Sequence, residues 1–167
     1  MIKSGITRRI DELGRIVVPK EIRFNLGIRE GDSLEIFTKD NAIVIKKYSE
    51  IENIFELSNN LCKIFYDIWG LSVIITDRDK VIACSGNLNI QEKNLPNNLK
   101  KMIDNRESIF NKYDKFFEIE GYFTILPIIV ASSVTGFVIV NSNKNNEDNV
   151  MNAKIIQKII CEKIDVL

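Results

Sequence analysis

The stretch GITRRIDELGRIVVPKEIR, residues 5–23, decides the fold of the N-terminal part of the chain. Two short runs rich in isoleucine and valine, residues 6–10 and 15–18, are typical of β-strands, and the polar, glycine-terminated segment between them favours a turn. Pro19 is suited to open a helix, because its fixed φ angle and missing N–H cost nothing in a first helical turn. The pattern therefore predicts two strands and a short helix over residues 20–26, ended by the glycine that follows.

A hairpin is expected after this helix. Residues 33–38 and 42–47 have the composition of strands, and the polar residues 39–41 between them favour a turn. Residues 1–48 would then contain four short strands and one short helix, which bury only a small core, and units of this size often need a partner copy for stability. We expect this segment to dimerise by interleaving strands.

The rest of the chain has the pattern of a second domain over residues 55–167, after a linker at 49–54. An amphipathic helix is expected up to Trp69, with apolar residues at spacings of three and four. Further elements are expected as follows: strands at 72–76, 81–85, 122–130 and 136–140, an edge strand at 115–119, a helix opened by Pro96, and a terminal helix at 150–166. Pro127 should lie at a bulge or an edge, because it cannot donate a ladder hydrogen bond. The predicted fold class is α+β.

The composition is typical of a soluble globular protein: 45% of the 167 residues are hydrophobic and 28% are charged. No apolar run approaches the roughly 20 residues of a spanning helix, and the N-terminus lacks the apolar segment of a secretory signal. We expect a cytoplasmic protein without a membrane segment. The three cysteines lie far apart without a CxxC pair, which indicates neither a zinc site nor a disulfide framework.

The absence of histidine excludes many enzyme mechanisms. Ser-His-Asp triads, Cys-His dyads and histidine-ligated metals cannot form, and the carboxylates are scattered without a converging spacing. We therefore expect no enzyme, no catalytic residue, no metal and no cofactor.

The charge balances overall but is unevenly distributed. Residues 1–29 carry a net charge of +4 and the remainder −4, and five of the seven arginines fall in these first 29 residues, whereas fourteen of the sixteen lysines come later. The planar arginine fork suits phosphate oxygens and guanine edges, while lysine is a solubilising point charge. The first 29 residues therefore look like a nucleic-acid face.

The run over residues 5–23, continued by LGI at 26–28, GD at 31–32 and LEI at 34–36, closely resembles the AbrB family of transition-state regulators. The resemblance covers residues 3–48 and implies an interlocked, swapped-hairpin dimer that binds double-stranded DNA through arginines. The positions that correspond are Arg8, Arg15 and Arg23, with Arg9 and Lys20 as auxiliaries. Phe24 departs from the pattern, since relatives often carry a second basic residue after Arg23.

The second half resembles a GAF domain in strand order and turn placement. An AbrB-like head on such a domain implies a sequence-selective transcriptional regulator of sporulation genes that binds AT-rich DNA as a homo-oligomer. The broad apolar stripe of the terminal helix favours contact with another subunit, which would close a homotetramer. An unidentified small molecule could bind the second domain. Phe116, Phe117, Tyr122 and Phe123 would either line its cavity or form core.

An alternative is the antitoxin of a toxin–antitoxin pair, because antitoxins share the swapped-hairpin head. That function predicts a disordered tail that wraps the toxin. The apolar, strand-rich second half of the chain argues against it.

Overall fold

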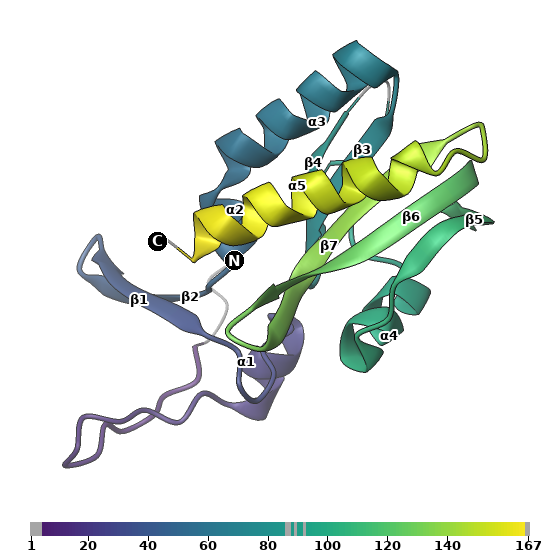
Figure 1. The fold of residues 1–167 in the computed structure, drawn as a ribbon. Coiled ribbons are helices and arrows are strands. Elements are labelled where there is room, and N and C mark those ends of the chain that lie inside the picture. The colour runs from purple at the N-terminus through teal and green to yellow at the C-terminus, as the bar shows by residue number, and fades with distance from the viewer. Residues whose placement is uncertain (1–4, 86–87, 89, 92, 166–167) are drawn as a thin grey trace. The chain divides into compact units, whose positions relative to one another are not determined.

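The computed structural model describes residues 5–85, 88, 90–91 and 93–165. The chain divides into two compact units, the first ending at Tyr48 and the second beginning at Ser49 (Figure 1). Both units mix helices and strands, and every strand pair is antiparallel, which confirms the α+β class.

The first unit contains one short helix and one hairpin: α1 (Lys20–Asn25), β1 (Leu34–Lys39) and β2 (Ala42–Lys47). Pro19 precedes the helix, and Gly27 follows it with a φ of 63°, a left-handed conformation that glycine adopts without strain. Asp40 and Asn41 both have positive φ, as a two-residue type I′ turn requires. The predicted helix and hairpin are confirmed.

The strands predicted at residues 6–10 and 15–18 are wrong for a single copy of the chain. Neither segment pairs with another strand, because β1 and β2 pair with each other and the described residues of this unit contain no further strand. The apolar side chains of both segments remain in solvent: Ile10 is 64% exposed and Val17 is 76% exposed. No apolar residue among residues 5–48 is buried.

The second unit is built around a five-stranded sheet in the order β4-β3-β7-β6-β5. Its strands are β3 (Ser72–Asp77), β4 (Val81–Cys84), β5 (Ile109–Phe116), β6 (Ile119–Val130) and β7 (Ser133–Ser142). Its helices are α2 (Glu50–Asn53), α3 (Phe55–Trp69), α4 (Asn97–Asn105) and α5 (Asp148–Ile164).

Helices cover both faces of this sheet (Figure 1). One core lies between the sheet and α2, α3 and α5, and it includes Val138 and Val140 of β7. The other core lies between the sheet and α4, and it includes Phe137 and Ile139 of the same strand. Burial on both faces explains why the central strands are continuous apolar runs rather than alternating ones.

Residues 49–54 are not the linker that the sequence suggested. Ser49 caps α2, because its hydroxyl accepts a hydrogen bond from the Glu52 N–H at 3.2 Å. Ile51 and Ile54 are buried in the core beneath α3 and α5. Because this short segment supplies two residues to the core, it belongs to the second unit, which begins directly after Tyr48.

Three other boundaries differ from the sequence prediction. The edge strand spans Ile109–Phe116 rather than 115–119, and the turn to β6 is made by two non-glycine residues with positive φ, Phe117 and Glu118. The turn from β6 to β7 is also shorter than expected, with only Ala131 and Ser132 at positive φ. Helix α5 begins two residues early, and Val166, its predicted end, lies outside the described residues.

Pro127 lies in β6, beyond the point where β5 stops pairing at Ile125. One side of β6 therefore has no neighbouring strand there, and a register shift follows between Ile128 and Ile129. The predicted edge or bulge position of Pro127 is confirmed. Its carbonyl accepts a hydrogen bond from the Gln157 side chain of α5, which attaches the helix to this part of the sheet.

Gly136 marks the closest approach of two strands in the second unit. A Cβ atom at this position would lie 1.9 Å from the Thr76 carbonyl oxygen and 2.8 Å from its carbon. Both are backbone atoms of the paired strand β3, so neither can move aside alone.

We expect Gly136→Ala to lower the free energy of unfolding of the second unit by about 3 kcal/mol, because the added methyl group must push two paired strands apart. Urea denaturation followed by circular dichroism measures the change. Ser133→Ala, at the exposed start of the same strand, is the matched control and should leave the midpoint unaltered. Equal midpoints for both variants would contradict the close approach.

Candidate nucleic-acid interface

Arg15, one of the candidate DNA-binding residues, follows a tight turn that Asp11 stabilises. One carboxylate oxygen of Asp11 accepts hydrogen bonds from the backbone N–H groups of Leu13 at 3.0 Å and Arg15 at 2.8 Å. Gly14 completes the turn with a φ of 76°, and its N–H donates to the Asp11 carbonyl. The predicted polar turn is confirmed, and it determines the direction in which Arg15 leaves the backbone.

The second carboxylate oxygen of Asp11 contacts the Arg15 side chain itself, with Nε donating at 2.7 Å. The backbone N–H of Arg15, followed by its guanidinium, holds the pKa of Asp11 below the ordinary value for a carboxyl group. Asp11 therefore stays ionised at neutral pH. The Arg15 side chain is 72% exposed, and its two terminal nitrogens have no partner among the described residues. Asp11 thus orients the guanidinium and leaves its outer edge open.

The other four candidates also lie at the surface. Arg8 donates to the neighbouring Thr7 carbonyl at 3.2 Å, and it makes no ion pair with the residues the structure describes. Arg9, which precedes the turn, likewise makes no ion pair with the described residues. Lys20 and Arg23, which lie on α1, make none there either. Lys20 and Arg23 are three residues apart and share one face of that helix. Of these five cations, only Arg15 has an acidic partner in the described part of the chain.

Sequence reasoning missed the role of Asp11, although the D-x-x-G spacing of residues 11–14 was a usable signal for it. An acceptor two to four residues before an N–H group is typical of an Asx turn. The ion pair with Arg15 could not be read from spacing, because it depends on the side-chain rotamers that the turn permits.

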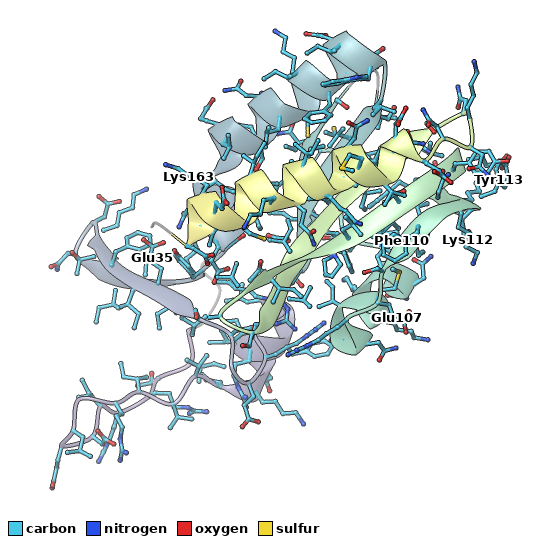
Figure 2. All side chains as sticks on the ribbon, in the orientation of Figure 1. Glu35, Glu107, Phe110, Lys112, Tyr113 and Lys163 are labelled. Carbon is cyan, nitrogen blue, oxygen red and sulfur yellow. The ribbon has the colours of Figure 1, made fainter. Side chains whose placement is uncertain are left out.

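Of the four aromatic residues considered as a ligand cavity, Phe116 and Phe123 are buried, Phe117 is partly buried against the same core, and Tyr122 is partly buried. Phe116 and Phe123 pack edge to face at 5.0 Å in the core beneath α4. Tyr122 packs against Tyr113 of β5, and both Tyr113 and Phe110 are exposed on that strand (Figure 2). These contacts favour the core interpretation for Phe116 and Phe123.

Two helices of the second unit expose large apolar side chains. Helix α3 exposes Ile64, Ile68 and Trp69, and helix α5 exposes Met151, Ile155 and Ile159. The stripe on α5 predicted to face the sheet is confirmed, since Ala153, Ile156, Ile160 and Ile164 are all buried. The exposed residues form a second apolar face on the same helix.

The residues that the structure describes contain no group of three or more histidine, cysteine, aspartate or glutamate side chains that could hold a metal ion. None of their helices is long and apolar enough to cross a membrane.

Two family models match the chain. Residues 7–53 match "Antidote-toxin recognition MazE, bacterial antitoxin", and residues 53–162 match "Stage V sporulation protein T C-terminal, transcription factor". The boundary between the two matches falls within four to five residues of the boundary between the structural units.

Two curated relatives come from Bacillus subtilis. Stage V sporulation protein T is 38% identical over 152 residues, which is 85% of each chain. Transition state regulatory protein AbrB is 54% identical over 48 residues, which is 29% of this chain and 50% of AbrB. Among solved structures, a methyl-accepting chemotaxis protein fragment has a TM-score of 0.52 at 16% identity, covering 69% of this chain and 92% of its own. That likeness shows a shared fold.

These matches confirm an AbrB-like first unit. The family model that matches residues 53–162 describes a transcription factor. The chain belongs to the stage V sporulation protein T family of transcription factors.

Proposed function

We propose that this transcription factor regulates sporulation genes by binding AT-rich duplex DNA as a homo-oligomer, through Arg8, Arg15 and Arg23 with Arg9 and Lys20 as auxiliaries. The observation that carries the proposal is the free cationic surface of the first unit. Four of these cations have no acidic partner among the described residues, and the fifth is held by Asp11 with its outer nitrogens open. Such groups are available to phosphate oxygens and base edges.

The preference for AT-rich DNA follows from the kind of side chain available. The candidate set is cationic and includes no asparagine or glutamine to form the bidentate pair that reads adenine. Selectivity then depends on groove width and local flexibility, and a narrow minor groove in A-tracts attracts arginine. Phosphate contacts would supply most of the affinity.

The first unit would act as a swapped dimer. Residues 5–48 bury no apolar residue in one copy, and the apolar segments 6–10 and 15–18 have no strand partner. A second copy would supply both the missing strands and the missing core. The two-fold axis of such a dimer would also duplicate the arginine set, in keeping with the pseudo-symmetry of duplex DNA.

The second unit would join dimers into a tetramer and receive a small-molecule signal. The exposed apolar faces of α3 and α5 support assembly, because contiguous apolar residues on a surface are typical of protein interfaces. Fold similarity alone does not identify a ligand, so the chemical nature of the signal is left open.

The antitoxin alternative rests on the antitoxin model matched by residues 7–53. It requires a tail without stable structure. Residues from Ser49 onward instead contain a five-stranded sheet with a core on each face, which a toxin-wrapping tail has no need of. Limited proteolysis distinguishes the two functions: a regulator yields a resistant fragment from Ser49 onward, and an antitoxin yields none.

We expect Arg15→Ala to reduce affinity for an AT-rich duplex at least tenfold and to make log affinity fall less steeply with log salt, because each copy loses a phosphate contact. Fluorescence anisotropy across a salt series measures both quantities. Arg15→Lys keeps the charge but lacks the Nε that Asp11 holds, so its affinity should fall between those of Arg15→Ala and the unaltered protein.

Arg106→Ala, in the second unit, is the matched control for loss of one arginine and should bind as the unaltered protein does. Unchanged binding by Arg15→Ala would remove Arg15 from the interface.

Deletion of residues 50–167 should leave a folded dimer that binds DNA more weakly than the full chain, because one tetramer can engage two sites and one dimer cannot. Light scattering after size exclusion gives the mass, and anisotropy gives the affinity. A monomeric or unfolded fragment would contradict the swapped-dimer head.

The double variant Ile68→Asp with Ile155→Asp should convert a tetramer to a dimer, because both changes place charges on the exposed apolar faces of α3 and α5. Sedimentation velocity measures the assembly state. Lys101→Asp on α4, which covers the opposite face of the sheet, is the control and should remain tetrameric. A tetramer in the double variant would place the interface elsewhere.

A further inference from the structure

Phe24 is the most exposed large hydrophobic residue in the described part of the chain, with 84% of its surface accessible. It lies on α1, directly after Arg23. An aromatic side chain of this size loses much of its apolar contact with water when it meets a partner, so its exposure in one copy points to a surface that is covered in the functional state.

Helix geometry places Phe24 on the same side of α1 as two of the candidate cations. At 3.6 residues per turn, Lys20, Arg23 and Phe24 lie within an arc of roughly 100° around the helix axis. Ile22 lies near the opposite side and is partly buried within the first unit. A second copy that packs on the Ile22 side would therefore leave Phe24 beside the two cations, on the face assigned to DNA.

A phenyl ring on a DNA-facing surface has a restricted set of partners. It can neither pair with phosphate nor donate a hydrogen bond to a base edge. The apolar group that duplex DNA presents in the major groove is the C5-methyl group of thymine, and aromatic and aliphatic side chains recognise it by contact. Lys20 and Arg23 would hold the backbone on either side of such a contact.

We propose that Phe24 is a specificity-determining residue that contacts a thymine C5-methyl group in the major groove. The inference rests on the proposed DNA-binding function and deepens it, because it assigns one direct base contact to a surface that otherwise reads charge and shape. The protein would then recognise AT-rich DNA through the thymine methyl group as well as through the width of the groove.

The test is a double-mutant cycle between protein and DNA. Anisotropy compares the unaltered protein and Phe24→Ala on an AT-rich duplex and on the same duplex with deoxyuridine in place of thymidine, which removes only the methyl groups. We expect the thymine-to-uracil change to weaken the unaltered protein about fourfold for each methyl in contact, the value for burying one methyl-sized group. Phe24→Ala should bind both duplexes equally and as weakly as the unaltered protein binds the uracil duplex.

Two results would overturn the inference while leaving the proposed function intact. Equal losses by Phe24→Ala on both duplexes would show that the ring contributes by another route, such as a wedge between base steps. Unchanged affinity of Phe24→Ala would show that the ring makes no contact. If the unaltered protein binds neither duplex at low salt, the proposed function and this inference both fail.

Three variants guard against indirect effects. Phe110→Ala removes an exposed phenyl ring from β5 in the second unit and should retain the full preference for thymine (Figure 2). Phe24→Leu keeps an apolar contact and should retain part of that preference. Phe24→Arg should abolish the preference and steepen the salt dependence by about one unit of slope, because it exchanges a methyl contact for a phosphate contact. Size exclusion confirms that each variant keeps the assembly state of the unaltered protein.

Discussion

Hydrogen bonding between strands is the interaction on which both units depend. In the second unit, β7 has a partner on each side and helices on each face, so its backbone groups are paired and its side chains are buried from Val134 to Asn141. In the first unit, residues 6–10 and 15–18 have strand-forming composition but no partner strand. One chain therefore contains a unit whose central strands are paired on both sides and a unit with two strand-like segments that have no partner in one copy.

The arginine surface depends in turn on local geometry that one copy already has. Asp11 accepts two backbone N–H groups and the Nε of Arg15, so turn formation and side-chain orientation use a single carboxylate. Order of this kind reduces the entropy lost when a guanidinium meets a fixed partner. The other four candidate cations, Arg8, Arg9, Lys20 and Arg23, contact no carboxylate among the described residues, which makes Arg15 the best-oriented of the five.

Much of the fold was predictable from residue patterns, and the errors share a physical cause. Helices α3 and α4, the hairpin of β1 and β2, and the central strands followed from periodicity and from Pro and Gly positions. The turns at Phe117 and Ala131 were misplaced because non-glycine residues adopt positive φ there, which carries no compositional signal. The segment 49–54 was read as a linker because burial of Ile51 depends on helices distant in sequence.

The sequence by itself determined the family, the candidate arginines and the division into two units, because these depend on residue types at fixed local spacing. Tertiary structure alone decided that Asp11 orients Arg15, that Phe24 is exposed on the cationic side of α1, and that residues 5–48 bury no apolar residue in one copy. These features depend on side-chain rotamers, on the orientation of a helix, and on whether residues distant in the sequence cover a given surface. Local patterns carry no information about such contacts.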